Sequence, residues 1–444
     1  MTFNKLGVNP ALVKTLNKME IVEPFPIQVK ALPDAINGKD VLGRGQTGSG
    51  KTLAFGLAVL TKLANRKAKA HHPLAIILSP TRELAMQIND VINSLAPSVH
   101  LSSRLVAGGM PYGAQIQALR KAVPILVSTP GRLMDLMEKK HVVLDEVEIV
   151  VLDEADQMAD MGFLPDMKAI LDACKKKGQR LLFSATLDRD VDVLVKKYLH
   201  NPVVHSVDSD KASVSTMSHH VLVIHPNDKD EIVANIAARD GKTIMFVKTQ
   251  HGADKLSTRL ASQGIPVGSL HGGKSQAVRT RTLAKFKSGQ INTLVATDVA
   301  ARGIHVEDIS LVVHIDPPQK AKDYLHRAGR TARAGESGHV VTLCNLKQQN
   351  TIRKLMTHVG INPKFVRIKP QSSELREITG AKKPSGVAWV APVEKQKEKE
   401  KSFNRDRNKN RNRNRGRNRN QGRNRKNRFN DKNKKRKSFR SNSN

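Results

Sequence analysis

The sequence predicts an α/β protein with two tandem domains, each built on a parallel sheet, followed by a disordered basic C-terminal tail. Three observations support this prediction. Short continuous apolar runs alternate with helical patterns, which is typical of parallel strands covered on both faces. The runs form two series, separated by a polar stretch near Val207 to Ser218 that we expect to act as a hinge. The last segment, Lys401 to Asn444, contains almost only Arg, Asn, Lys, Ser and Gly.

The expected elements follow from the alternation along the chain. In the first domain, buried strands are expected at 39–44, 74–80, 124–130, 148–154 and 179–186, and helices at 53–64 and 82–96. In the second domain, strands are expected at 219–226, 242–249, 291–298, 309–316 and 338–344, and helices at 252–264 and 277–289. We place the domain boundaries at 1–30, 31–207, 218–368 and 369–444, the last range being linker and tail.

Composition narrows the class of protein. The chain has 444 residues, and its 75 Lys and Arg exceed its 40 Asp and Glu to give a formal charge of +35. Apolar residues make up 39%, which is enough to build folded cores. No apolar run is long enough to span a membrane, and the first residues lack the pattern of a secretory signal. With only two cysteines, we expect a cytoplasmic protein with a polyanionic partner, nucleic acid in the first place.

The charge is concentrated at the C-terminus. Lys401 to Asn444 carry 19 Lys and Arg against 2 Asp and Glu, a net charge of +17, which leaves +18 for the rest of the chain. Such a segment cannot bury enough apolar surface to offset the loss of chain entropy, so we expect it to be disordered. It can hold RNA through phosphate contacts, and its phenylalanines can stack on bases. The alternative is a merely solubilising tail.

A phosphate-binding loop is expected at Gly45 to Thr52, which reads GQTGSGKT and fits the pattern GxxxxGK[ST]. An expected strand precedes the loop and an expected helix follows it, so backbone N–H groups and the helix N-terminus can meet phosphate oxygens. Lys51 would reach the β- and γ-phosphates, and Thr52 would hold Mg²⁺. The predicted nucleotide contacts of the loop are Gly45, Gln46, Thr47, Gly48, Ser49, Gly50, Lys51 and Thr52.

Two acidic residues end an apolar strand about a hundred residues further on. Asp153 and Glu154 stand in VVLDEAD, at the carboxyl end of the strand, where open α/β sheets bind their ligands. The carboxylate of Asp153 suits Mg²⁺, directly or through water. Glu154 can orient and deprotonate an attacking water molecule. These two residues and Lys51 are the predicted catalytic residues of the first domain.

The motifs together resemble those of the DEAD-box ATP-dependent RNA helicases, of the bacterial type, from about Phe3 to about Val366. Their name comes from DEAD, here Asp153 to Asp156. The other matching motifs are PTREL at 80–84, GG at 108–109, TPGR at 129–132, SAT at 184–186, FVKT at 246–249, HGGKSQAVR at 271–279, ATDVAARGIH at 296–305 and HRAGRTAR at 326–333.

The resemblance implies two RecA-like domains with ATP and Mg²⁺ bound between them. HRAGRTAR places Arg327, Arg330 and Arg333 at a spacing of three residues, on one helical face where they can converge on an anion. In the family the last two act as arginine fingers, so we assign Arg330 and Arg333 to catalysis. For Arg327 a structural ion pair is the alternative. Ser184, Thr186, His326 and Arg327 match positions that couple the nucleotide state to strand separation.

Adenine selection resembles the family's Q motif, through Gln28 and the upstream aromatic Phe3. Glu20-Ile21 replaces the usual Gly-Phe, and Phe25 replaces the usual Thr or Ser, so the packing of adenine departs from the family pattern. His305 stands where the family commonly has an aspartate that contacts the ribose. Its imidazole can still bond a hydroxyl group, and a tolerated substitution is the alternative.

By the same resemblance, loops of both domains contact RNA. The expected contacts are Pro80, Thr81, Arg82, Gly108, Gly109, Thr129, Pro130, Gly131, Arg132, Gln276, Arg279 and Thr297. Hydroxyls, glycine N–H groups and arginines suit phosphates and 2′-hydroxyls rather than base edges, so we expect little sequence specificity. The expected activity is local strand separation without processive travel, in ribosome assembly, RNA remodelling or decay. A non-enzymatic RNA chaperone, a DNA helicase and an ATP-gated RNA clamp are the alternatives.

Overall fold

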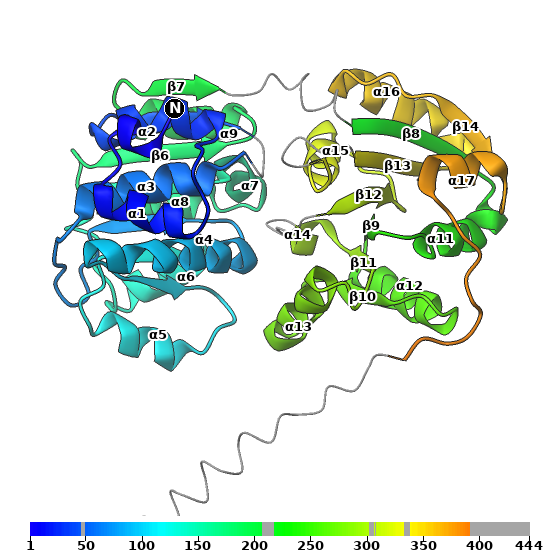
Figure 1. Ribbon diagram of the computed structural model, residues 1–444, viewed down its shortest axis with the longest axis horizontal. Coiled ribbons are helices and arrows are strands. Elements are labelled where there is room, and N and C mark those ends of the chain that lie inside the picture. Colours follow the sequence, from blue (N-terminus) through cyan, green and yellow to red (C-terminus); the bar gives the residue numbers. More distant parts are fainter. Residues whose placement is uncertain (46–48, 207–216, 302–305, 307, 333–337, 391–444) are drawn as a thin grey trace, which may run out of the picture. The chain divides into compact units, whose positions relative to one another are not determined.

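Two parallel β-sheets organise the chain. The structure, a computed structural model, describes residues 1–45, 49–206, 217–301, 306, 308–332 and 338–390. Within these residues there are two seven-stranded sheets, and every strand pair in them is parallel. We call residues 1–206 the first lobe and residues 217–389 the second lobe. Figure 1 shows that helices flank each sheet. The predicted fold class is confirmed.

The first sheet has the strand order β3-β4-β2-β5-β6-β1-β7. Its strands are β1 (Val41–Arg44), β2 (Ala75–Leu78), β3 (Ser103–Val106), β4 (Ile125–Ser128), β5 (Ile149–Asp153), β6 (Gln179–Ser184) and β7 (Val203–Ser206). The helices on one face are η1 (Phe3–Leu6), α1 (Pro10–Lys18), α2 (Pro26–Ile36), α3 (Lys51–Leu63), α4 (Arg82–Leu95) and η2 (Ala96–Val99). Those on the other face are α5 (Tyr112–Leu119), α6 (Pro130–Glu138), α7 (Ala155–Asp160), α8 (Leu164–Ala173) and α9 (Arg189–Tyr198).

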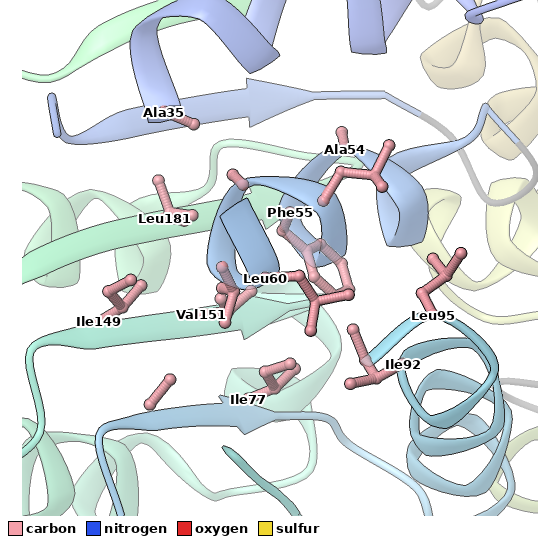
Figure 2. Close-up of a cluster of buried hydrophobic side chains, with 14 of the residues drawn as sticks. Ala35, Ala54, Phe55, Leu60, Ile77, Ile92, Leu95, Ile149, Val151 and Leu181 are labelled. Atoms are coloured by element: carbon pink, nitrogen blue, oxygen red, sulfur yellow. The ribbon is translucent and has the colours of Figure 1, made fainter. Parts of the chain in front are cut away.

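The first core lies between the sheet and α3, which is buried on almost every side. Figure 2 shows Phe55 and Leu60 of α3 beside Val151 of β5 and Ile77 of β2, with Ile92 of α4 closing the cluster. All five side chains are fully buried. Truncating a buried Phe to Ala typically costs about 3–5 kcal/mol of unfolding free energy. This packing fixes the helix that begins at the phosphate loop.

The second lobe repeats the same plan, with the strand order β10-β11-β9-β12-β13-β8-β14. Its strands are β8 (Met217–Ile224), β9 (Lys242–Phe246), β10 (Val267–Leu270), β11 (Thr293–Ala296), β12 (Ile309–His314), β13 (Gly338–Cys344) and β14 (Phe365–Ile368). One face is covered by α13 (Gln276–Lys287), α14 (Asp298–Ala301), α15 (Ala321–Ala328) and α16 (Gln349–Val359). The other is covered by α11 (Lys229–Ala237), α12 (Gln250–Ser262) and α17 (Ser373–Thr379). The short turns η3 (Pro226–Asp228) and η4 (Leu346–Gln348) have no buried residue.

All ten predicted strands are present, and the four strands that were not predicted are the sheet edges β3, β7, β10 and β14. The edge strands are half-exposed, with burial that alternates or varies along the strand, so they lack a continuous apolar run. The predicted hinge lies outside the described residues except for Met217 and Ser218, which already belong to β8.

Two expected domain boundaries differ from the structure. The boundary at residue 30 falls inside α2, and the preceding residues pack into the first core through Leu12 and Leu16. The folded second lobe continues past residue 368, because Leu375 of α17 is fully buried in its core. The chain then follows the end of α12, where the Trp389 N–H donates to the Ala261 carbonyl at 2.8 Å. The tail from residue 391 lies outside the described residues.

No helix among the described residues combines the length and the apolar character that crossing a bilayer requires. The two cysteines, Cys174 and Cys344, are both buried and free. Burial raises the pKa of Cys344 to about 11, so this thiol stays protonated at neutral pH.

Candidate nucleotide and nucleic-acid site

The predicted phosphate loop joins the carboxyl end of β1 to the first turn of α3. The Gly45 N–H donates to the Ser184 carbonyl at 3.2 Å, which ties the start of the loop to the end of β6. Lys51 is buried, and its ammonium donates to the Gly45 carbonyl at 2.5 Å. The charge of Lys51 therefore lies at the start of α3, at the positive end of the helix dipole, where a phosphate would be bound. Gln46, Thr47 and Gly48 lie outside the described residues.

Gln28 is buried against this loop. Its side-chain amide donates to the Gly50 carbonyl and accepts the Phe25 N–H, both at 2.9 Å. Gly50 has a φ of +88°, and a Cβ there would lie 2.6 Å from the Gln28 amide nitrogen, so the contact requires glycine. Gln28 thus connects the start of α2 to the last turn of the phosphate loop. Its predicted bond to an adenine edge stays a prediction.

Phe3 occupies a different place from the one its predicted role requires. Its ring is 1% exposed and packs into the first core. A ring with no free face cannot contact a base directly, so any influence of Phe3 on nucleotide binding passes through the packing of η1 and α1. Phe25, in contrast, is 44% exposed beside Gly50, where its Cβ and a ring carbon would lie 3.1 Å from a Cβ on the glycine.

Asp153 and Glu154 stand at the carboxyl end of β5, and both are buried. Glu154 has a φ of +53°, a left-handed conformation that turns the chain sharply into α7. Burial raises the pKa of Asp153 to about 7; the charge of Lys51 opposes this shift and that of Glu154 adds to it. Two carboxylates and one ammonium therefore share a poorly solvated space at the strand end.

The donor set at this strand end fits a magnesium ion. Oδ1 of Asp153 is buried and has no hydrogen-bond partner among the described residues. Thr52 follows Lys51 in the first turn of α3 and offers a hydroxyl oxygen. Mg²⁺ prefers hard oxygen ligands and is usually held by one or two protein groups together with water and substrate phosphates. A divalent cation would also satisfy the orphaned carboxylate oxygen of Asp153.

Ser184 ends β6, which lies between β5 and β1 in the sheet, and Thr186 stands two residues further on. Asp156 Oδ2 accepts the N–H of Thr186 at 2.9 Å and its hydroxyl at 2.8 Å, and the Ser184 hydroxyl donates to the Thr186 carbonyl at 2.7 Å. His326 Nε2 stands 3.8 Å from the same carboxylate oxygen. Burial alone would raise the pKa of Asp156, but His326 and Thr186 hold it well below its usual range. The DEAD and SAT motifs therefore form one network with His326.

In the second lobe, the described arginines of HRAGRTAR have distinct environments. Arg327 makes a bidentate ion pair with Asp298, with its Nε and Nη2 donating at 2.6 and 2.8 Å, and its Nη1 donates to the Asp316 carbonyl. This is the structural ion pair that the sequence left as the alternative. Arg330 is 2% exposed, and its Nε donates to the His326 carbonyl at 3.2 Å. Arg333 and His305 lie outside the described residues.

The predicted RNA contacts of the first lobe follow the carboxyl ends of β2, β3 and β4. Thr81 caps α4, where its hydroxyl accepts the Leu84 N–H at 3.3 Å, and Thr129 accepts the Gly108 N–H at 3.4 Å. Gly109 has a φ of +69°, and a Cβ there would collide with the Arg82 guanidinium. Pro130 and Gly131 form the first turn of α6, and Arg132 stacks on the Tyr112 ring, with its Cζ 5.0 Å from the centroid.

Contacts also join this group to α13, which carries the predicted Gln276 and Arg279. Arg82 donates to the Gln276 side chain, whose amide donates to Glu83 at 3.1 Å. Glu83 pairs with Arg279 at 2.9 Å. Burial lowers the pKa of Arg82; Glu83 opposes this shift, and the charges of Arg279 and Arg132 add to it. Three guanidinium groups therefore influence one another here, with Glu83 paired to Arg279 and Asp135 4.0 Å from Arg132. The excess of positive charge favours an anion. Thr297 lies at the end of β11, before α14.

The structure adds residues that sequence reasoning did not single out. Asp156 is the last residue of the DEAD motif, and only its place in that motif indicated a functional role. Lys322 of α15 forms ion pairs with Asp160 at 2.9 Å and Asp188 at 2.5 Å, which no spacing in the sequence indicates. Asp298 was expected with Thr297 on the RNA face, and the structure shows instead that its carboxylate holds Arg327.

Comparison with known proteins identifies the class of protein that this arrangement belongs to. Residues 25–194 match the family model described as DEAD/DEAH box helicase, and residues 228–335 match that of the helicase conserved C-terminal domain. The ATP-dependent RNA helicase CshA of Listeria monocytogenes is 36% identical over 353 residues, which are 79% of this chain and 67% of that relative. The mitochondrial DEAD-box ATP-dependent RNA helicase 9 of Arabidopsis thaliana is 39% identical over 80% of this chain.

The chain belongs to the DEAD-box helicase family. Its alignment spans 59% of the length of the Arabidopsis relative. Among solved structures, S. cerevisiae Dbp5 bound to RNA and ADP BeF3 matches with a TM-score of 0.77 and 29% identity, over 85% of this chain and 98% of that one. Mss116p bound to ssRNA and AMP-PNP matches with a TM-score of 0.73 and 26% identity, over 85% of this chain and 82% of that one.

Proposed function

We propose that the protein is an ATP-dependent RNA helicase. It binds the sugar-phosphate backbone of RNA, separates short duplexes locally, and hydrolyses ATP so that it is released from the RNA. The observation that carries this proposal is that the carboxyl edge of the first sheet holds two groups of side chains, one suited to ATP and one suited to RNA. The groups suited to ATP follow β1, β5 and β6, and the groups suited to RNA phosphates follow β2, β3 and β4 of the same sheet. Family membership and the bound RNA of Dbp5 and Mss116p support the assignment.

Hydrolysis follows from the groups at the strand ends. Lys51 and the backbone of the loop bind the β- and γ-phosphates, and Gln28 holds the loop in shape through Gly50. Glu154 orients the attacking water and accepts its proton. Thr52 and Asp153 would hold Mg²⁺, which neutralises phosphate charge when it is bound. Arg330 and Arg333 stabilise the charge of the transition state from the second lobe.

Coupling between ATP and RNA follows from the shared network. Asp156 bonds both groups of Thr186 and lies near His326, while Lys322 pairs with Asp160 and Asp188. The second lobe therefore contacts both the DEAD and the SAT motif of the first lobe. It can respond to a nucleotide only if these contacts differ between the nucleotide-bound and the nucleotide-free protein. We propose that the network, rather than any single side chain, carries the coupling. The pathway and the cytoplasmic location stay predictions.

The chemistry of the sheet edge separates this proposal from the alternatives. A non-enzymatic RNA chaperone acting through the tail has no use for the buried carboxylates Asp153 and Glu154 beside Lys51. A DNA helicase is excluded if RNA stimulates ATP hydrolysis and matched DNA does not. The test is phosphate release by the full chain with a short RNA, with DNA of the same sequence, and with neither. We expect stimulation by RNA alone.

Removing the tail tests its electrostatic role. We expect deletion of residues 401–444 to weaken RNA binding and to flatten its dependence on salt, because the segment carries a net charge of +17. If it neutralises about six phosphates, its contribution falls by roughly 10³ between 50 and 200 mM salt. RNA affinity across a salt series measures the slope, and phosphate release at saturating RNA serves as the control, which should be unchanged. An unchanged slope would contradict the role.

Phe25 is the aromatic that we propose packs on adenine in this chain. Ile21, at the position where the family has its aromatic, packs against the first core, whereas Phe25 is exposed beside the phosphate loop. We expect Phe25→Ala to raise the KM for ATP about tenfold, since an aromatic contact and its burial together contribute about 1–1.5 kcal/mol. Val22→Ala, at a position that is 56% exposed in the same segment, is the matched control. Equal shifts in the two variants would refute the assignment.

A further inference from the structure

A groove of about 1050 Å³ lies at the amino edge of the first sheet, the end opposite to the phosphate loop. Its walls come from the segments before β1, β5, β6 and β7 and from the last turn of α3. Since the motifs described above follow the carboxyl ends of strands, none of them contributes to this groove. Five Lys and Arg side chains line it, against two carboxylates, Asp40 and Glu148.

Both carboxylates of the groove already have partners. Asp40 is buried, and its two oxygens accept the backbone N–H groups of Arg180 at 2.8 Å and His200 at 2.7 Å. Glu148 pairs with Arg66 at 2.8 Å and stands 3.7 Å from the Lys175 ammonium. The acidic groups are thus committed to the protein itself. Three of the five cations are paired as well, Lys39 with Asp34 at 2.9 Å and both Arg66 and Lys175 with Glu148, which leaves Lys62 and Lys177.

Lys62 is one of the two basic groups of the groove that make no ion pair among the described residues. It is half-buried, and its ammonium donates to Oε1 of Gln179 at 2.9 Å. Gln179 is itself fixed, because its amide donates to the Ala35 and Lys39 carbonyls at 2.8 and 2.6 Å. Within the described part of the chain, no carboxylate approaches Lys62 or Lys177 within ion-pair distance. Burial lowers the pKa of Lys62, which a bound anion would reverse.

The position of Lys62 in the last turn of α3 offers a plainer explanation, since a cation there complements the helix dipole. That explanation accounts for the charge of one residue. It does not account for the held geometry of Lys62 and Gln179, or for Lys177, which reaches the groove from a different loop.

We propose that this groove binds phosphate groups, at a site separate from the phosphate loop, with Lys62 and Lys177 as the contacting cations. The volume and the several cations suit an oligophosphate rather than a single phosphate. Its source is either the backbone of an RNA strand or a free small oligophosphate, and both present the same chemistry to ammonium groups.

The test is lysine acylation of the full chain, read at each lysine by mass spectrometry. The protein is labelled alone, with tripolyphosphate, and with a short RNA. With the ligand at ten times its Kd, we expect labelling of Lys62 and Lys177 to fall about tenfold. Lys14 and Lys18, two exposed lysines of α1 without ion pairs among the described residues, should not change. Labelling of Lys51 reports binding at the phosphate loop independently. A failure of the groove to bind can therefore be distinguished from a failure of the phosphate loop.

Each outcome decides the proposal. Protection of Lys62 and Lys177 by tripolyphosphate indicates a small-molecule site, and protection by RNA alone indicates a backbone contact. Protection by neither probe overturns the proposal, and so does equal protection of Lys14 and Lys18, which would mean a general ionic effect. In Lys62→Gln, protection of Lys177 should require about tenfold more ligand, whereas Lys14→Gln should leave it unchanged.

Discussion

Replacing Glu154 by glutamine is expected to lower the rate of RNA-stimulated ATP hydrolysis by about 10²–10⁴-fold while leaving the affinity for ATP nearly unchanged. Glu154 is buried directly after Asp153 at the end of β5. Glutamine has the same shape and can still orient a water molecule, but its amide cannot accept the proton. Single-turnover phosphate release gives the rate, and titration with a non-hydrolysable ATP analogue gives the affinity.

Glu138→Gln is the matched control for this variant. Glu138 is an exposed glutamate at the end of α6, so the same change of one carboxylate to an amide should leave the rate of hydrolysis unaltered. If Glu154→Gln hydrolysed ATP at the rate of the unaltered protein, the assignment of Glu154 as the base would be wrong, and the water would have to be activated by another group.

Arg330→Ala is expected to lower kcat by about 10³–10⁵-fold with little change in the KM for ATP, because an arginine finger acts on charge that develops only in the transition state. Arg330→Lys should recover little of this loss, since an ammonium cannot reproduce the planar fork of a guanidinium. Steady-state phosphate release at saturating RNA measures both constants. A rise in KM at constant kcat would contradict a finger role for Arg330.

Arg327, three residues earlier, provides the comparison. Its guanidinium is committed to Asp298 and to the Asp316 carbonyl. Removing one partner of such a buried pair typically costs about 3–5 kcal/mol, so Arg327→Ala should lower the free energy of unfolding in denaturant. Because Arg330 is also buried, the unfolding of its variants is measured in the same way, and their rates are compared on folded protein. The two arginines are thus told apart by the quantity that changes: the free energy of unfolding for Arg327→Ala and kcat for Arg330→Ala.

The strands that could be predicted are those buried on both sides. Nine of the ten predicted strands have apolar runs, because helices cover both faces of the sheets, and β1 (VLGR) was expected from its place before the phosphate loop. The edge strands lack such runs: β3 carries the exposed Arg104, and β7 has only two apolar residues, Val203 and Val204, before His205. Helix α17 was missed for a similar reason. It is short and polar, and Leu375 is its only fully buried apolar residue in the described structure.

Those residues of the site that stand at or just after the ends of predicted strands could be placed from the sequence. Asp153 and Ser184 each end a strand, and Lys51 opens the helix after one, so parallel pairing alone brings them to one edge. The partners of these groups depend on side-chain packing, and spacing does not reveal them. Asp156 with Thr186, Lys322 with Asp188, and Gln28 with Gly50 join segments between 22 and 134 residues apart. The burial of Phe3 likewise follows from the packing of η1.

The most direct test of the central proposal is strand separation of a short RNA duplex by the full chain. The account predicts separation that requires ATP, turns over repeatedly only with Glu154 intact, and fails on a DNA duplex of the same sequence. Equal separation without ATP would contradict it and would favour an RNA chaperone acting through the basic tail.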